Sequence, residues 1–186
     1  MTRVLAAGDV VTTLKNTVDK VVTEHGVAEL RGRWLALAVL TETIGRACPS
    51  SALCFGMHCV GTAVIAAKAT DYHKDRYLRP IAQGRHITTL SLSESGSGTH
   101  FYLPRTHLRE DGEQFVVDGE KQFITNGGHA DSYVMSVAPA EAQASQAGDF
   151  SCIVVDADSP GLEWQAPWAG FGMRGNSSRG LKVAGA

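Results

Sequence analysis

The sequence lacks an excess of charge of either sign. Its 186 residues carry 17 basic and 19 acidic side chains, for a formal net charge of −2. Nucleic acids and anionic membrane surfaces attract strongly basic proteins, so this balance favours neither partner. No membrane span is expected, because Glu42, Arg46 and Lys68 interrupt the longest apolar stretches. The N-terminal apolar run is too short for a signal peptide, and we expect a cytoplasmic protein.

Cysteine pairs suited to a metal or a redox centre are also missing. The four cysteines, Cys48, Cys54, Cys59 and Cys152, form no C-x-x-C pair. Three of them fall in an alanine-rich apolar region, where cysteine usually behaves as a small buried hydrophobic residue, so we expect reduced structural thiols. His58 stands beside Cys59, but no further ligand follows at a fitting spacing. The sequence therefore predicts no metal site.

The pattern of apolar residues changes near residue 87. Before that point the three- and four-residue spacing is typical of helices. It predicts helices over residues 10–25, 27–46, 52–70 and 72–82. Ser50 or Ser51 is expected to cap the third helix, which is apolar on nearly all sides, as in a helix buried between others. Pro80 is expected to interrupt the fourth.

After residue 87 the period becomes two, as in strands. Strands are expected over residues 88–93, 132–137 and 150–155, and a hairpin is expected with arms at residues 114–117 and 120–126. Asp118-Gly119 between the arms favours a type I′ turn. We expect a surface loop over residues 138–149, a turn over residues 156–161, and aromatic packing from Trp164, Trp168 and Phe171. The fold class is therefore α+β: an N-terminal helical domain, residues 1–86, followed by a largely antiparallel β domain, residues 87–186.

Two polar segments follow strands of the β domain. The first, residues 92–99, holds four hydroxyl side chains, two glycines and one carboxylate. The second, residues 119–128, is expected to place Lys121, Phe123 and Thr125 on one face of its strand and then to turn at Asn-Gly-Gly. Neither has the spacing of a phosphate loop. Hydroxyls, backbone N–H groups and one aromatic ring suit the polar edge of a flat heterocycle.

In this order and spacing, the two segments resemble the acyl-CoA dehydrogenase family. That family typically shows a Thr-Glu-Pro-x-x-Gly-Ser-Asp-like run and, further along, a Gly-x-Lys-x-Trp-Ile-Thr-Asn segment. The matching residues are 93–100 and 119–128, and the likeness continues through residues 154–162 to 171–178, so it covers at least residues 85–186. By this resemblance, the β domain is the family's antiparallel, barrel-like middle domain, and the helical part is its N-terminal domain.

The resemblance implies that the β domain binds FAD. The implied cofactor-binding residues are Leu92, Ser93, Gly98, Thr99, Phe123, Ile124 and Thr125. The hydroxyls of Ser93 and Thr99, with the backbone of their neighbours, would hydrogen-bond the pyrimidine side of the flavin. Phe123 stands where the family usually has Trp, against the ring, and Thr125 would place its hydroxyl near flavin N5. Such donors orient the cofactor and tune its electronics.

The implied substrate is an acyl thioester, carried on CoA or on an acyl-carrier protein. Thr99 and His100 occupy the substrate-binding positions, with His100 where the family usually has Asp, and Ser95 stands where it usually has Pro. These departures affect the geometry of the loop and its contact with the thioester. The electrons would leave to an electron-transfer flavoprotein or another acceptor.

No catalytic residue is expected on this chain. Dehydrogenation of an acyl thioester at its α and β carbons requires a carboxylate base aimed at the α carbon. In the family this glutamate lies on a C-terminal helical domain, together with residues that hold the FAD diphosphate and adenine, and no segment here resembles that domain. Glu94, the only acid of the first polar segment, is expected to satisfy backbone N–H groups.

The chain by itself is therefore expected to be inactive. It reads as a fragment of a longer protein or as one subunit of a split enzyme, and its last residues, 181–186, read as an unfinished strand. We expect apolar surface to drive association, as a homo-oligomer or with a complementary C-terminal subunit. A flavin monooxygenase or acyl-CoA oxidase on the same fold, and a non-catalytic partner subunit, are the alternatives.

Overall fold

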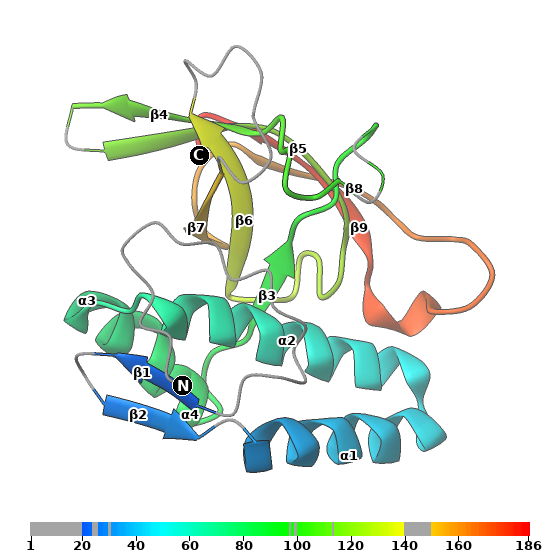
Figure 1. Cartoon of the computed structure of the whole chain (residues 1–186). Helices are drawn as coiled ribbons and strands as arrows, with labels where there is room; N and C mark the ends of the chain where they lie inside the picture. The colour runs from blue at the N-terminus through cyan, green and yellow to red at the C-terminus, as the bar shows by residue number, and fades with distance from the viewer. Residues whose placement is uncertain are drawn as a thin grey trace.

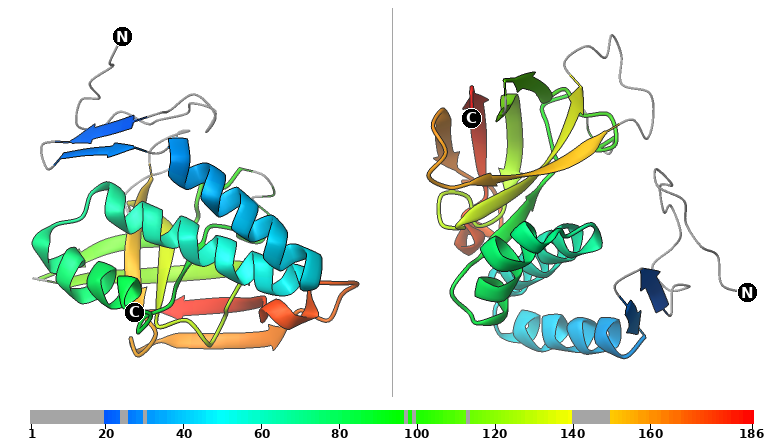
Figure 2. Two further views of the ribbon diagram at one scale, coloured as in Figure 1. Left: turned by 90° about the horizontal axis from the view of Figure 1, so that it is seen from below. Right: turned by 90° about the vertical axis from the view of Figure 1, so that its left-hand side faces the viewer.

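The computed structural model describes residues 20–23, 26–29, 31–96, 98, 100–112, 114–139 and 150–186. Its helical part contains two long helices, α1 (Arg31–Ala47) and α2 (Pro49–Ala67). A short helical run follows, made of α3 (Asp71–His73), the π-helical turn η2 (Lys74–Leu78) and α4 (Arg79–Ala82). Figures 1 and 2 show these helices as a layer beneath a curled sheet, with α2 between α1 and that sheet.

The first two expected helices are only partly correct. Lys20–Thr23 and Gly26–Glu29 form two antiparallel strands, β1 and β2, and not the end of one helix and the start of the next. Residues 10–19 lie outside the described part of the chain. Two adjacent β-branched valines in β1 and a glycine at the start of β2 lower the helix propensity of this stretch, and pairing between the strands decides its structure.

The helix α2 begins at Pro49, and Cys48, in an extended conformation, is its N-cap. The prediction that Ser50 or Ser51 caps it is therefore wrong, because both lie in its first turn. Proline has a fixed φ and no N–H to satisfy, so it suits the first helical position and keeps the residue before it extended. The expected interruption at Pro80 is also wrong. The run from Asp71 to Ala82 is continuous, and Pro80 lies in the first turn of α4.

The β domain is a curled, seven-stranded sheet. Its strands are β3 (Thr88–Ser91), β4 (His107–Asp111), β5 (Gln114–Ile124), β6 (Ser132–Pro139), β7 (Ser151–Asp156), β8 (Leu162–Pro167) and β9 (Arg179–Ala184). The order is β3-β6-β4-β5-β9-β8, with β7 paired to β6, as Figure 1 shows. The pairs of β6 with β3 and β4 are parallel and all others are antiparallel. The predicted strands over residues 88–93, 132–137 and 150–155 correspond to β3, β6 and β7.

The expected hairpin around Asp118-Gly119 is wrong. β5 runs through both residues without turning, since Asp118 pairs with His107 of β4 and Gly119 with Val183 of β9. The hairpin in this region is formed by β4 and β5, and its connection contains Gly112, at φ 65°. The residues expected to form two arms therefore form one long strand.

Two apolar clusters form the core. One lies within the sheet domain and includes Val117, Ile124, Tyr133, Met135, Val137, Leu181 and Val183. Trp164 packs on this cluster, with its ring 5.0 Å from that of Tyr133. The other joins helices to sheet through Ile65, Tyr77, Leu90 and Val134. The expected turn over residues 156–161 is present, and the expected loop over residues 138–149 falls mostly outside the described residues.

The helix α2 is less buried than its composition suggests. Only Ala52, Gly61 and Ile65 are buried on it. By length and composition alone it is long and apolar enough to cross a membrane, because no charged residue lies between Arg46 and Lys68, but core helices also meet this criterion. α2 packs on β3, where a Cβ at Gly61 would lie 3.1 Å from the backbone of Thr89.

The four cysteines are free, and Cys48 is exposed where burial was expected.

Candidate functional site

The two polar segments meet where β5 bulges away from β9. The pairing of β5 with β9 shifts register between Lys121 and Ile124. In this interval the N–H of Gln122 donates to the carbonyl oxygen of Ser93, at 2.7 Å. Since a bulge leaves backbone groups unpaired within the sheet, it makes the N–H of Gln122 available for this bond. The polar loop after β3 is thereby tied directly to the strand that carries Phe123 and Thr125.

Phe123 has a backbone conformation that a bulky residue rarely adopts. Its φ is 55°, in the left-handed region, and its side chain is 60% exposed. The ring of Trp168 lies edge-on to it, with 5.7 Å between the ring centroids. Left-handed conformations of residues other than glycine carry strain and concentrate at functional sites. The bulge therefore presents an aromatic ring to the surface beside the polar loop.

The bulge also changes which side chains share a face. Strict alternation predicts Lys121, Phe123 and Thr125 on one face of β5. The structure buries Lys121 and Thr125 and exposes Phe123. The side chain of Ile124 is buried in the apolar cluster of the sheet, so only its backbone is available to a ligand. The prediction of a shared face is wrong, because the bulge interrupts the alternation.

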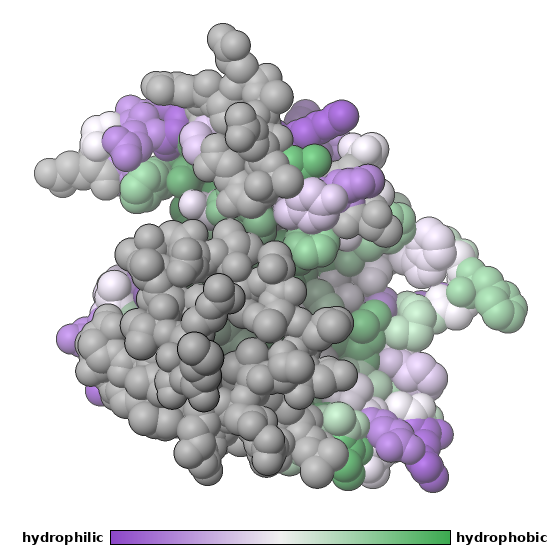
Figure 3. Space-filling view, viewed as in Figure 1, coloured by the Kyte–Doolittle hydropathy of each residue, from purple (hydrophilic) through white to green (hydrophobic). Residues whose placement is uncertain are grey.

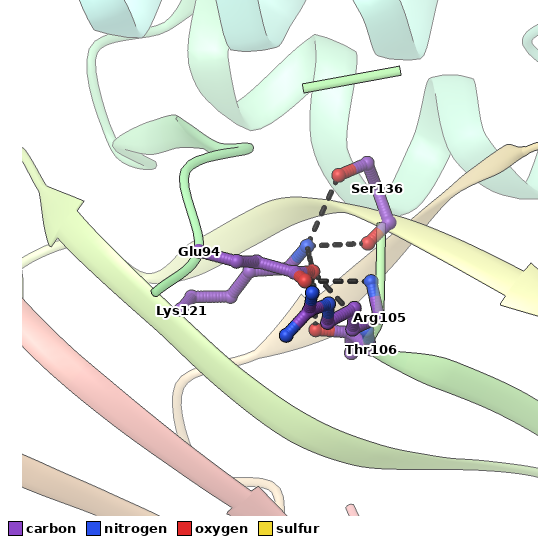
Figure 4. Close-up of polar contacts among 5 residues, drawn as sticks. All are labelled: Glu94, Arg105, Thr106, Lys121 and Ser136. Atoms are coloured by element: carbon purple, nitrogen blue, oxygen red, sulfur yellow. Dashed lines mark hydrogen bonds and ion pairs between the residues drawn. The ribbon is translucent and has the colours of Figure 1, made fainter. Parts of the chain in front are cut away.

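A buried ion pair lies beneath the loop, between Glu94 and Lys121, and Figure 4 shows its surroundings. The ammonium of Lys121 donates to Glu94 Oε1 at 2.6 Å, and to the carbonyl and hydroxyl oxygens of Ser136 at 2.6 and 3.0 Å. Glu94 also accepts from the N–H of Arg105 at 2.6 Å, and from the N–H and hydroxyl of Thr106 at 3.1 and 2.7 Å. As expected, Glu94 satisfies backbone N–H groups. With these donors already bound, the carboxylate is not placed to act as a base.

Both members of this pair have perturbed pKa values. Burial raises the pKa of Glu94, but hydrogen bonds from Lys121, Thr106 and the N–H of Arg105 outweigh it, so the pKa lies below its ordinary value. Burial lowers the pKa of Lys121, and its contacts with Glu94 oppose this shift without cancelling it. The three oxygen acceptors around Lys121 match the three N–H groups of an ammonium.

Asn126 connects this site to the helical layer. It has φ 60°, and its amide Nδ2 donates to the carbonyl oxygen of Cys54 on α2 at 3.3 Å. Its backbone N–H donates to the carbonyl oxygen of Asn176, at 2.9 Å, in the short 3-10 helix η3 (Arg174–Asn176). The sequence predicted the turn here but not this linking role.

The structure brings together only part of the residue set predicted from the sequence. Ser93, Gly98, His100 and Phe123 are exposed, Leu92 is half-buried, and Ile124 and Thr125 are buried. Thr99 lies outside the described residues. His100 has its ring 5.6 Å from that of Tyr102, so an aromatic pair continues the polar loop. Their roles toward a ligand remain predictions.

The aromatic residues expected near the end of the chain have different environments. Trp164 belongs to the core, Trp168 packs on Phe123, and Phe171 is fully exposed. Figure 3 shows hydrophobic surface where the loop between β8 and η3 projects from the molecule. Among the described residues, no group of three or more His, Cys, Asp or Glu side chains is arranged to hold a metal ion.

Known protein families and proteins have sequences similar to this chain. Residues 10–85 match the model of the acyl-CoA dehydrogenase N-terminal domain, and residues 89–185 match that of the middle domain. The cyclohex-1-ene-1-carbonyl-CoA dehydrogenase of Geobacter metallireducens is 32% identical over 143 residues, covering 76% of this chain and 37% of the relative. A probable acyl-CoA dehydrogenase of Bacillus subtilis is 33% identical over 151 residues, covering 79% of this chain and 24% of the relative.

Solved structures agree with the sequence matches. The acyl-CoA dehydrogenase of Geobacillus kaustophilus superimposes with a TM-score of 0.73 at 27% identity, covering 81% of this chain and 40% of that one. An acyl-CoA dehydrogenase of Bacillus anthracis, complexed with FAD, gives a TM-score of 0.65 at 27% identity, covering 74% and 23%. The chain thus spans less than half the length of each of these relatives. With both domain models matched along nearly its whole length, the chain belongs to the acyl-CoA dehydrogenase family.

Proposed function

We propose that this chain provides the flavin-binding part of an FAD-dependent enzyme that dehydrogenates an acyl thioester. The observation that carries the proposal is the meeting of the two polar segments at the bulge of β5, where the N–H of Gln122 donates to Ser93 O. This contact brings the loop after β3 beside the exposed ring of Phe123. A relative of known structure is complexed with FAD, and other relatives are named as acyl-CoA dehydrogenases.

The residues present fit an isoalloxazine ring. A flavin needs hydrogen-bond donors along its polar edge and an aromatic or apolar surface against its face. The exposed Ser93 and the backbone of the same loop supply donors, and the exposed, strained Phe123 supplies a face. Thr125, two residues further along, is buried, and we assign to its hydroxyl the role of orienting a ring atom.

The residues of this chain have the task of holding and orienting the cofactor. FAD, when bound, supplies the acceptor for the hydride that leaves the β carbon of the acyl group. Ser93 and its neighbours orient the pyrimidine edge, and Phe123 with Trp168 shields one face of the ring from water. The ion pair keeps Glu94 charged and occupied. We therefore assign the base that removes the α proton to a C-terminal helical half, in the same polypeptide or in a partner subunit.

The substrate we propose is an acyl thioester on CoA, in line with the names of the relatives, or on an acyl-carrier protein. Loop residues Thr99 and His100 are the positions proposed to face it. Electrons would pass to an electron-transfer flavoprotein or another acceptor. We also propose that the chain works as an oligomer, either with copies of itself or with the C-terminal half, which would cover exposed apolar residues of α1 such as Val39 and Leu40.

An absorbance spectrum of the purified protein tests this proposal. We expect the visible band of bound flavin when the chain is joined to, or mixed with, its C-terminal half. The variants Ser93→Ala and Thr125→Ala should weaken binding, because each removes a proposed hydroxyl donor. If circular dichroism shows a folded chain that binds no flavin under either condition, a non-catalytic partner role replaces the proposal. Rapid reaction of the reduced enzyme with oxygen would instead favour an oxidase or monooxygenase.

A further inference from the structure

We propose that Glu94 and Lys121 form a positioning pair that sets the register of the flavin-binding loop against the bulge of β5. This inference rests on the proposed function. It assigns a role to two residues that are not themselves expected to touch the cofactor. The pair is drawn in Figure 4, where both side chains point inward from the loop and from β5 toward Ser136 of β6.

Stability alone does not account for a pair so deeply buried. The side chains of Lys121 and Glu94 are 0% and 3% exposed. Removing two charges from water costs free energy that their attraction often fails to recover, and a well-packed apolar pair in such a place can be equally or more stable. A charged pair differs from an apolar one because its hydrogen bonds are directional and fix one geometry. We therefore expect the pair to determine the relative position of the two segments that it joins.

These two segments are the ones proposed to bind the flavin. Glu94 directly follows Ser93, and Lys121 directly precedes Gln122. The side-chain bond between Lys121 and Glu94 and the backbone bond from Gln122 N–H to Ser93 O therefore join the same two segments at adjacent positions. A single hydrogen bond allows rotation about its axis, whereas two adjacent bonds fix both distance and orientation.

The far end of the loop is held by the same carboxylate. Glu94 Oε2 accepts from the N–H of Arg105, and Oε1 from the N–H and hydroxyl of Thr106. One side chain thus closes the loop that carries Gly98 and His100. Lys121 in turn anchors it to β6 through both oxygens of Ser136. Loss of the pair would release the start and the end of the loop together.

The test compares FAD affinity and loop protection in matched variants. Glu94→Gln and Lys121→Met each break the pair while keeping a side chain of similar size. Val155→Ala, a buried truncation on β7 outside both segments and outside the ion-pair network, is the control for general destabilisation. Affinity is measured by titration with FAD in the protein assembled with its C-terminal half. Hydrogen exchange of the Arg105 and Thr106 amides is measured on the chain itself.

We expect FAD to bind at least about tenfold more weakly to both pair variants and about equally to the control. The Arg105 and Thr106 amides should lose protection in Glu94→Gln and keep it in Val155→Ala. The double variant should bind no more weakly than the worse single one, because the two residues act as a unit. Should Glu94→Gln fail to fold, Thr106→Val and Ser136→Ala each remove one bond of the network and should show the same effects more weakly.

The possible failures can be told apart. If the wild type binds FAD and the pair variants bind it as tightly as the control does, the positioning role is wrong and the proposed function stands. If the wild type binds no FAD, the proposed function fails and the positioning role fails with it.

Discussion

A Cβ atom added to Gly119 would lie 2.7 Å from both the Cα and the Oγ1 of Thr106. Real Cβ atoms do not approach other atoms so closely, so the absence of a side chain at Gly119 lets the strand pass directly over Thr106. This close approach matters for the site, because Thr106 donates its N–H and hydroxyl to Glu94 beneath the loop proposed to bind the flavin. Gly119 is thus part of the support of the site.

Gly119→Ala is expected to lower the free energy of unfolding by about 1–3 kcal/mol. The new methyl group has to displace the backbone of Thr106, and the φ of 155° at Gly119 is one that residues with a Cβ rarely adopt. Urea unfolding followed by circular dichroism measures this free energy. Gly56→Ala on α2 is the matched control. Nothing lies within 4 Å of a Cβ at Gly56, and the substitution should stabilise the helix by about 0.5–1 kcal/mol. Equal effects of the two variants would contradict the close approach.

Gly119 also explains why the sequence predicts the hairpin at the wrong place. The sequence contains two Asp-Gly pairs seven residues apart in this region, Asp111-Gly112 and Asp118-Gly119. The chain reverses near the first pair and runs straight through the second. Local turn propensity is equal for both, and the contact of Gly119 with Thr106, distant in sequence, decides between them. By contrast, β6 followed from its apolar run, because burial in the core reinforces the local pattern.

The candidate site, like the hairpin, could be predicted only in part from the sequence. The resemblance to the family pointed to Ser93, Phe123 and Thr125, and the structure places the two segments that carry them side by side. Periodicity put Lys121 on the face of Phe123, but a register shift between β5 and β9 separates them. A bulge depends on pairing with a neighbouring strand, so one strand's sequence does not specify it. No local sequence signal marks the pair, because Glu94 and Lys121 each lie among polar neighbours in the two polar segments.

Phe123→Ala is expected to separate flavin binding from stability. The ring is 60% exposed and its edge-on contact with Trp168 is worth about 1 kcal/mol, so the unfolding midpoint should change little. FAD should bind at least about tenfold more weakly, since the ring's proposed role is to cover the flavin face. Phe115→Ala, at the other end of β5 and 56% exposed, is the control and should leave FAD affinity unchanged. A similar loss in both variants would argue against a specific contact.

Stability should fall in acid because of Glu94. Its pKa in the folded protein lies below the ordinary value of 4.5, so its contribution is complete above that pH, where the carboxylate is ionised in both states. As the pH falls below 4.5, the unfolded chain binds a proton first and unfolding is favoured. The stabilisation by the Glu94 carboxylate is lost completely once the pH falls below its lowered pKa. Urea midpoints between about pH 5 and pH 3 should fall less steeply in Glu94→Gln than in the wild type. If the urea midpoints of the two proteins fall equally steeply with pH, other carboxylates cause the loss of stability in acid.

Substitutions at Asn126 should separate the contribution of its left-handed backbone conformation to stability from that of its side-chain hydrogen bond. Asn126→Gly keeps the conformation at φ 60° and loses the donor to Cys54 O, which should cost about 1 kcal/mol of unfolding free energy. Asn126→Ala loses the same bond and adds the cost of a left-handed residue with a Cβ, about 1–2 kcal/mol more. The expected order of urea midpoints is wild type, then glycine, then alanine. An alanine variant as stable as the glycine variant would mean that the turn relaxes away from the left-handed conformation, and that its link to α2 depends on the side chain alone.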